Sequence, residues 1–263
     1  MNFVSVLPRD KILKPELPEN ASFKLVGLGG VGGIVARYLT LFLASLNRNV
    51  RLVFVDGDSF EPSNTARMLF GGYGNKSEVV RADLLPCVLE SRLSLLAIDE
   101  YVNRENIDRL ISNGDVVLVC VDNHATRKLL DEYCSTLRDV CVISGGNDGI
   151  ERTAGGRQSR GTYGNVQVHV RRAGEDLTPS LVRYHPEIAN PTDKLPTDRS
   201  CTELMTSVPQ ILFANLTVAA AMLNALWLHL CGALHYGELS LDIAERIMRP
   251  AQLTRNDCAA EGA

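Results

Sequence analysis

Five of the seven residues from 27 to 33 are glycine, and this run constrains the fold more than any other feature of the sequence. It follows the short apolar segment Phe23–Val26 and opens an apolar stretch that reaches about Leu46. The spacing Gly27-x-Gly29-x-x-Gly32 is typical of the turn between a first strand and a first helix in nucleotide-binding α/β folds. Glycines permit the tight turn and let phosphates approach the backbone N–H groups of the helix N-terminus. We therefore predict a phosphate-binding turn; the alternative is a tight turn that binds nothing.

The rest of the first half alternates between strand-like and helix-like segments. We expect a strand at Arg51–Val55, a helix at Asn75–Leu96, strands at Ala97–Val102 and Asp115–Val121, a helix at Ala125–Leu137 and a strand at Val140–Ser144. Asp122 or Asn123 is a plausible N-cap of the helix at Ala125–Leu137. Such a series predicts an α/β fold with a doubly wound sheet that binds its ligands at the carboxyl ends of the strands.

The second half has no such alternation. Gly145–Gly164 is predicted as a loop, and Asn165–Arg171 has the period of an exposed strand. Arg172–Arg199 is polar, contains four prolines and shows no period, so we predict a long crossing loop. The apolar helix Ile211–Leu230 follows, then a short strand near Glu238–Ile243 and a frayed end.

The chain is expected to form a single domain over residues 1–263, with a nucleotide-binding half at 22–146 and a C-terminal half at 147–250. The C-terminal half would contain a crossover loop at 172–200 and an interface helix at 203–230.

Composition excludes several classes of protein. The net charge is −4 and the pI is about 5.8, which argues against a nucleic-acid partner or a membrane surface. The N-terminus lacks the pattern of a signal peptide, and no two of the seven cysteines have C-x-x-C spacing. A cytoplasmic chain with reduced thiols and no structural zinc site is the simplest expectation. The segment Ile211–Leu230 is nearly long enough to span a bilayer, but its Asn215, Asn224 and His229 favour a helix buried in a core or dimer interface.

Charged residues follow the glycine run in a pattern that suits a triphosphate. Asp56 ends the second expected strand, where a carboxylate can accept hydrogen bonds from ribose hydroxyls. Arg67 and Lys76 can neutralise phosphate charge, and Asp122 can bind Mg²⁺, which prefers oxygen ligands. Each of these three, taken alone, is as well explained by surface charge or helix capping. A nicotinamide site would need no such set.

Taken together, the motifs resemble those of the ThiF/MoeB adenylators and the activating enzymes of ubiquitin-like proteins. The motifs are the glycine run, Asp56-Gly57-Asp58, Ser63-Asn64-x-x-Arg67, Lys76 and Asp122-Asn123-x-x-x-Arg127. The resemblance covers about Phe23 to Leu230. It implies a Rossmann-like ThiF/MoeB fold with a mixed sheet, parallel in its N-terminal half and antiparallel in its C-terminal part. The short length and the missing zinc motifs are more similar to compact bacterial members from operons for ubiquitin-like conjugation.

The resemblance also implies an activity and a set of site residues. The activity is adenylation, with ATP and Mg²⁺, of the C-terminal glycine of a ubiquitin-like or sulfur-carrier protein. By resemblance, Asp56 contacts the ribose, Asn64, Arg67 and Lys76 contact the phosphates, and Asp122 binds the metal. The remaining cofactor-binding residues would be Gly27, Gly29, Gly30, Gly32, Asp58 and Asn123. The family usually has Gln after the arginine, whereas this chain has Met68, so one polar contact near the phosphates is lost or replaced.

Cys201 lies where many members of the family carry a reactive cysteine. A thiolate there would attack the acyl adenylate and form a thioester, from which a conjugating enzyme is a further acceptor. Arg199 and the start of the next helix both favour the thiolate. The alternative is an incidental cysteine in an enzyme that stops at the adenylate, as MoeB-like members do. The resemblance further implies a homodimer, in which Arg9 is the sole candidate for an arginine that reaches the partner's ATP.

Three other functions fit the pattern less well. One is a family member that activates another carboxylate, such as one linked to tRNA or to a peptide. The second is an NAD(P) oxidoreductase, and the third is a non-catalytic half of a heterodimer. Arg67, Lys76 and Asp122 argue against the oxidoreductase. The same three residues together with Asp56 argue against the non-catalytic half.

Overall fold

Five parallel strands form one side of the main sheet in the computed structural model, which describes residues 12–66, 68–152, 158–198 and 210–252. Their order is β5 (Leu93–Ile98), β2 (Val50–Val55), β1 (Ala21–Val26), β6 (Val116–Val119) and β7 (Val140–Asn147). β1 pairs with β2 on one side and with β6 on the other, so the chain order changes direction beside β1. In open α/β sheets the ligand crevice lies at this place, beyond the carboxyl ends of the strands.

The sheet continues into antiparallel strands. β10 (Tyr163–Arg172) pairs with β7 on one edge and with β12 (Tyr236–Asp242) on the other, and β13 (Ile247–Gln252) pairs outside β12. The two-residue strand β11 (Glu175–Asp176) folds back on the end of β10. The predicted mixed sheet, parallel first and antiparallel later, is confirmed.

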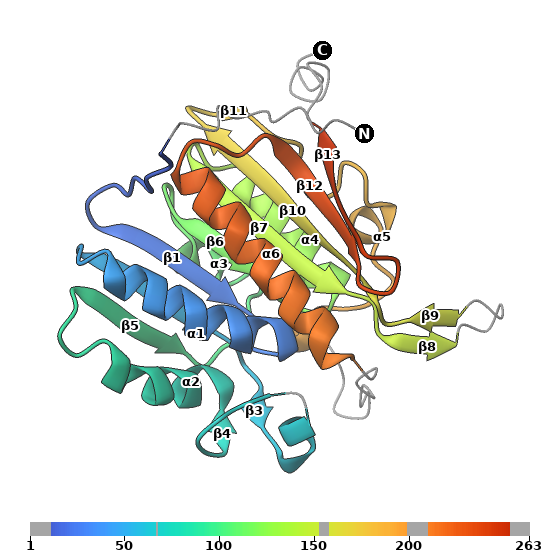
Figure 1. Cartoon of the computed structure of the whole chain (residues 1–263), viewed down its shortest axis with the longest axis horizontal. Helices are drawn as coiled ribbons and strands as arrows, with labels where there is room; N and C mark the ends of the chain where they lie inside the picture. The colour runs from blue at the N-terminus through green and yellow to red at the C-terminus, as the bar shows by residue number, and fades with distance from the viewer. Residues whose placement is uncertain (1–11, 67, 153–157, 199–209, 253–263) are drawn as a thin grey trace.

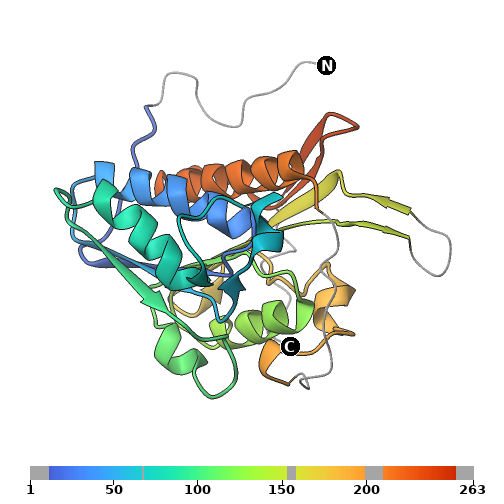
Figure 2. The same ribbon diagram turned by 90° about the horizontal axis from the view of Figure 1, so that it is seen from below.

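Helices cover both faces of the sheet (Figures 1 and 2). α1 (Gly30–Ser45), α2 (Lys76–Leu84) and α6 (Leu212–Leu230) share one core with Phe23 and Leu25 of β1. α3 (Ile107–Leu110) and α4 (His124–Cys134) share a second core with Val26. Because side chains alternate along a strand, the apolar residues of β1 contribute to both cores. Its one charged residue, Lys24, is buried and forms an ion pair with Asp115 at 3.6 Å.

Short elements fill the connections. They are β3 (Ser59–Phe60), η1 (Pro62–Ala66), β4 (Gly74–Asn75), η2 (Leu85–Cys87), β8 (Ile150–Arg152), β9 (Gln158–Arg160), α5 (Pro186–Ala189) and η3 (Pro196–Asp198). β8 and β9 form a hairpin that projects from the body of the molecule (Figure 1). The predicted crossover loop therefore contains β11, α5 and η3, although most of it is irregular.

The expected helix at 75–96 and the expected strand at 97–102 are wrong in their bounds. α2 ends at Leu84, and Pro86 lies in the short turn η2 that follows. Proline has no backbone N–H and disfavours a helical conformation of the residue before it, so it ends this helix. The next strand begins earlier than predicted, at Leu93, and pairs in parallel with all six residues of β2.

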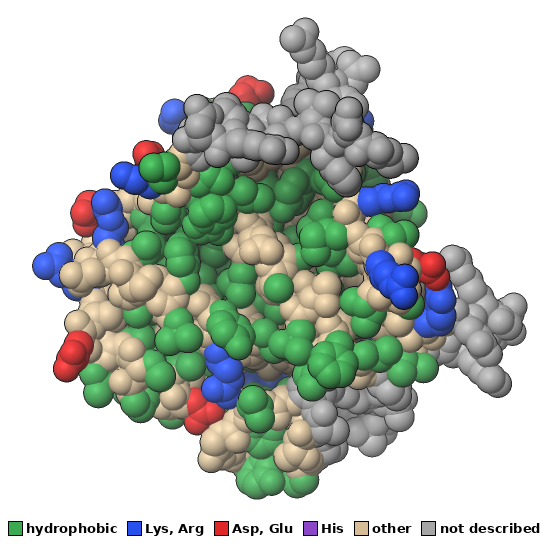
Figure 3. Space-filling model, viewed as in Figure 1, with side chains coloured by type: hydrophobic (Ala, Val, Ile, Leu, Met, Phe, Trp, Pro, Cys, Tyr) green, Lys and Arg blue, Asp and Glu red, His purple; other side chains and the backbone are tan. Residues whose placement is uncertain are grey.

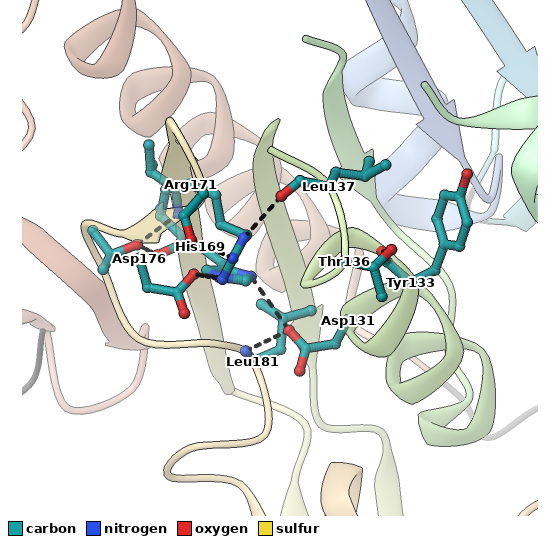
Figure 4. Close-up of polar contacts among 12 residues, drawn as sticks. Asp131, Tyr133, Thr136, Leu137, His169, Arg171, Asp176 and Leu181 are labelled. Carbon is teal, nitrogen blue, oxygen red and sulfur yellow. Dashed lines mark hydrogen bonds and ion pairs between the residues drawn. The ribbon is translucent and has the colours of Figure 1, made fainter. Parts of the chain in front are cut away.

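The strand expected at 165–171 was predicted to be exposed, and this is also wrong. Gln167 and His169 are buried because the segment that follows β10 packs over their side of the strand and supplies polar partners. Gln167 donates to the carbonyl of Leu181 at 3.1 Å, and His169 Nε2 lies 2.8 Å from Asp176 Oδ1 (Figure 4). The alternating polar residues of this strand had indicated a face exposed to solvent. Polar residues that form buried hydrogen bonds produce the same alternation.

Other bounds in the second half also differ from the prediction. β7 extends to Asn147, and residues 150–160 include the β8–β9 hairpin in place of a loop. The strand β13 was not predicted; its Pro250 is tolerated because β13 is an edge strand. The interface helix expected at 203–230 begins at Leu212 among the described residues, and residues 203–209 lie outside them.

α6 is the one described helix that is long and apolar enough to cross a bilayer, with a mean hydropathy of 1.4. In this fold, however, it lies on the sheet beside α1 (Figures 1 and 2). Its inner side, which includes Ala219, Met222 and Leu226, is buried in the core. This packing agrees with the predicted buried helix and leaves the outer side of α6 exposed.

Candidate nucleotide site

The glycine turn connects β1 to α1 in a conformation that side chains would block. Gly27 has a φ of +88°, and a Cβ there would lie 2.9 Å from the carbonyl of Cys120. A Cβ on Gly32 would lie 1.9 Å from the carbonyl oxygen of Gly27. Beside Gly29, by contrast, the nearest atom to such a Cβ is the Met68 methyl group at 3.8 Å, so space remains at the start of α1. The turn therefore has the close packing and open helix N-terminus of a phosphate-binding loop.

Asp56 at the end of β2 is tied directly to this turn. Its Oδ2 accepts the backbone N–H of Leu28 at 2.5 Å, and its Oδ1 accepts the N–H of Asp58 at 2.8 Å. Burial raises the pKa of Asp56, an effect that the nearby Lys76 ammonium and the two backbone N–H groups oppose. Each carboxylate oxygen retains a second lone pair, so Asp56 can still accept a ribose hydroxyl.

Lys76 forms an ion pair with Asp58. Its side chain is buried, and its Nζ lies 2.8 Å from Asp58 Oδ2. Its backbone N–H also donates to the carbonyl of Asp58 at 2.8 Å. The hydroxyl of Tyr101 donates to the other oxygen of Asp58, and its ring packs over Gly57, where a Cβ would lie 2.7 Å from it. The structure thus brings the predicted Asp56, Asp58 and Lys76 together beside the glycine turn.

Asn75 holds this arrangement in place. Its Oδ1 accepts the N–H groups of Ser77 and Glu78 and so caps α2, which begins at Lys76. Its Nδ2 donates to the carbonyls of Asp56 at 2.7 Å and Asp58 at 3.1 Å. A single amide therefore fixes both the start of α2 and the turn that carries the two acids.

The predicted phosphate contact Asn64 has a local role in this structure. It lies in the turn η1, where its Oδ1 accepts the N–H of Glu61 at 2.9 Å. Its carbonyl also accepts the N–H of Met68 at 3.0 Å, the residue whose methyl group lies beside Gly29.

Asp122 and Asn123 lie beyond the carboxyl end of β6, as predicted. Asp122 is exposed, whereas Asn123 is buried and donates to the carbonyl of Lys194 at 3.1 Å. Asn123 occupies the N-cap position of α4 without a capping bond from its side chain. The carboxylate of Asp193, in the crossover segment, caps the helix by accepting the N–H groups of His124 and Ala125, both at 2.8 Å. Asn123 is therefore the N-cap residue, as predicted, but the capping hydrogen bonds come from Asp193, and the carboxylate of Asp122 is not used as a cap.

Arg127, the arginine of the Asp122-Asn123-x-x-x-Arg127 motif, is buried and connects two strand ends. Its guanidinium donates to the carbonyls of Val121 and Gly145 and to the hydroxyl of Ser144, at 2.8–2.9 Å. Burial lowers the pKa of Arg127, although nearby Cys120, Asp122 and Asp193 oppose that effect. Arg127 thus ties together the carboxyl ends of β6 and β7 on one side of the crevice.

Three predicted residues, Arg9, Arg67 and Cys201, lie outside the described residues. Of the other cysteines, Cys134 and Cys141 are buried, and burial raises the pKa of each to about 12. Cys120 is partly buried, and burial raises its pKa to about 12 as well. These three thiols belong to the core, whereas Cys87 is exposed.

Sequence reasoning missed Asn75, Tyr101 and Asp193 at this site. Asn75 had a local signal, because Asn three residues before Glu78 is a common helix start. Tyr101 and Asp193 had no local signal, because each bonds to a residue far away in the sequence. Tyr101 is 43 residues from Asp58, and Asp193 is 69 residues from His124.

Comparison with known proteins agrees with this geometry. The model of the ThiF family matches residues 17–251. Protein HesA of Nostoc sp. is 27% identical over 135 residues, which are 51% of either chain. The adenylyltransferase and sulfurtransferase MOCS3 of Drosophila persimilis is 34% identical over 128 residues, 47% of this chain and 27% of that protein. The chain thus spans about half the length, or less, of these curated relatives.

Solved structures share the fold. The crystal structure of E. coli MccB with ATP has a TM-score of 0.64 and 16% identity, over 93% of this chain and 67% of that one. The structure of PaaA has a TM-score of 0.61, over 88% of this chain and 64% of that one. The predicted Rossmann-like ThiF/MoeB fold is confirmed.

Proposed function

The chain belongs to the ThiF family, and we propose that it adenylates the C-terminal carboxylate of a ubiquitin-like or sulfur-carrier protein, using ATP and Mg²⁺. One observation carries the proposal. A glycine turn, a ribose-type acid and a buried lysine lie together at the carboxyl ends of β1 and β2, joined by the bonds Leu28–Asp56 and Asp58–Lys76.

The residues fit the parts of ATP. The start of α1 would bind phosphate through backbone N–H groups and the positive end of the helix. Asp56 would accept the ribose hydroxyls, and Lys76 would exchange Asp58 for a phosphate oxygen. A buried cation that is already desolvated interacts strongly with such an anion.

Mg²⁺ would be held by Asp122, whose exposed carboxylate is free of helix capping. The described residues contain no group of three or more potential metal-ligating side chains. This fits Mg²⁺, which takes most of its ligands from phosphates and water and neutralises phosphate charge.

In the proposed reaction a carboxylate oxygen attacks the α-phosphorus. A bond forms between this oxygen and the α-phosphorus. The bond between the α-phosphorus and the oxygen that bridges to the β-phosphate breaks, and pyrophosphate leaves with its electron pair. The protein would contribute mainly positioning and neutralisation of charge, by the glycine turn, Lys76 and Asp122.

The first test is pyrophosphate exchange into ATP in the presence of candidate carriers. We expect exchange only with a carrier that ends in glycine, and we expect Asp122→Ala to abolish it while the fold survives. If the protein catalyses pyrophosphate exchange with a free peptide but with none of the carrier proteins, its substrate is a peptide. Exchange near the wild-type rate in Asp122→Ala would remove that residue from the site.

A second step is proposed for Cys201. Its thiolate would attack the acyl carbon of the adenylate, forming a C–S bond while AMP leaves with the oxygen. Cys201→Ala should therefore retain pyrophosphate exchange and lose any reductant-sensitive adduct with the carrier. A non-reducing gel tests this, with Cys87→Ala as a control that removes an exposed thiol elsewhere. A surviving adduct in Cys201→Ala would assign the nucleophile to another cysteine.

A further inference from the structure

The N-terminal ends of two helices meet at the glycine turn. α1 begins at Gly30 and α6 at Leu212, and the two helices lie side by side on one face of the sheet (Figures 1 and 2). A Cβ on Gly30 would lie 2.2 Å from Asn215 Nδ2 and 3.1 Å from Gln210 Oε1. The first turn of α6 therefore touches the first residue of α1, and only glycine leaves room for this contact.

Asn215 is an unusual residue at this contact. Its side chain is fully buried, with an exposed fraction of 0%. Its Nδ2 donates to Gln210 Oε1 at 3.3 Å, but its Oδ1 has no hydrogen-bond partner within the described structure. A buried polar atom without a partner destabilises the folded chain, so such an atom calls for a reason.

The surroundings of Asn215 favour an anion. Each helix N-terminus carries a partial positive charge of roughly half a unit, and two of them converge here. The amides of Asn215 and Gln210 can both rotate by half a turn and keep the hydrogen bond between them. This rotation presents Asn215 Nδ2, a donor, at the position that now lacks a partner.

We propose that Asn215 is a further nucleotide-binding residue, whose side-chain amide donates to a phosphate oxygen held on the glycine turn. The inference rests on the proposed ATP site and deepens it, because it adds the start of α6 to a site otherwise built from residues 27–122. The phosphate supplies the partner that the buried amide lacks in the free chain.

The test is the isosteric change Asn215→Asp, followed by calorimetric titration with ATP and with adenosine. A carboxylate in place of the amide repels phosphate and keeps the shape of the side chain. We expect ATP to bind about tenfold more weakly, or worse, from the loss of one charge-assisted hydrogen bond. Adenosine, which has no phosphate, should bind as it does to the wild type. Asn49→Asp adds the same charge at an exposed position before β2, at the opposite end of the strands from the glycine turn, and should change neither affinity.

A buried carboxylate can also prevent folding, so Asn215→Ala is the second variant. Alanine keeps the helix and removes the donor, and the ATP affinity should fall several-fold with adenosine binding unchanged. Unchanged ATP affinity in Asn215→Ala overturns the inference. Equal losses for ATP and adenosine overturn it too, because they indicate a packing role alone. A wild-type chain that binds neither ligand overturns the ATP site itself, and the inference with it.

Discussion

At the scale of single residues, buried polar side chains determine much of the chemistry of this chain. Lys76 shows this for the proposed site. Its charge is matched by Asp58, and Asp58 is held in turn by Tyr101. In the free chain the pair avoids an isolated buried charge, which would cost several kcal/mol. The proposed reaction uses the same lysine only when a phosphate takes the place of Asp58.

His169 is a second buried polar residue, and its pairing predicts a dependence of stability on pH. Its Nε2 lies 2.8 Å from Asp176 and its Nδ1 lies 3.5 Å from Asp131 (Figure 4). Burial lowers the pKa of His169, but the two carboxylates outweigh it, so the pKa is raised above its ordinary value of 6.5. When the pKa of a histidine is higher in the folded state than in the unfolded state, its protonation stabilises the fold. This stabilisation is fully present at a pH below the pKa of the unfolded state, and it is lost as the pH rises through the pKa of the folded state.

We therefore expect His169→Gln to destabilise the fold most at low pH. The loss should be about 2 kcal/mol near pH 5.5, where the wild-type imidazole is charged and paired, and should shrink toward pH 9. Urea unfolding of both proteins across this range measures the difference. His235→Gln is a control on a histidine outside this cluster. A loss that is constant with pH would contradict the charged pairing.

At the scale of elements, the crossover segment is hydrogen-bonded to α4 along most of the helix. Asp193 caps the first turn of the helix, Asn123 donates to the carbonyl of Lys194, and Lys128 donates to the carbonyl of Ala189. Asp131 accepts the backbone N–H of Leu181 at 2.8 Å, so contacts extend to the far end of α4. Residues 181–194 are thereby joined to the helix that follows Asp122.

Asp193→Ala tests this capping. We expect a loss of about 1–2 kcal/mol in the free energy of unfolding, because two N–H groups lose their acceptor and the helix N-terminus loses a nearby negative charge. Urea unfolding measures the loss. Asp198→Ala removes an exposed carboxylate from the same segment, which forms a surface ion pair with Arg104, and should cost less than about 0.5 kcal/mol. Equal effects from the two changes would show that the cap contributes nothing specific.

At the scale of the whole molecule, α1 and α6 present apolar side chains to solvent on one face (Figure 3). Tyr38 and Leu41 of α1 are 57% and 52% exposed, and Phe213 of α6 is 68% exposed. Trp227 lies on the exposed side of the same helix. Contiguous apolar patches of this kind mark interaction sites in soluble proteins.

We predict that this face forms the interface of a symmetric homodimer. Light scattering at micromolar concentration should give twice the mass of the chain. Phe213→Glu should dissociate the dimer, because a symmetric interface buries the introduced charge twice. Tyr184→Glu, at an exposed position of the crossover segment, is the matched control and should leave the mass unchanged. A monomeric wild type would contradict the prediction.

The sequence alone determined the parts of this protein that depend on local chemistry. A tight turn that excludes side chains requires glycine, and strands buried on both faces require apolar runs. Gly27, Gly32, β1, β2 and β6 were therefore predictable, and so was the position of Asp56. The set of motifs identified the family because its spacing reflects the same local requirements.

Only the tertiary structure decided which distant residues meet. Asp193 caps α4 from a segment with no periodic pattern, Tyr101 donates to Asp58 from the segment after β5, and Asn215 lies against Gly30. His169 is buried although its strand has the polar alternation of an exposed one. These contacts depend on how segments far apart in the sequence pack together. The local sequence around a polar residue is the same whether that residue hydrogen-bonds to water or to a side chain from a distant segment.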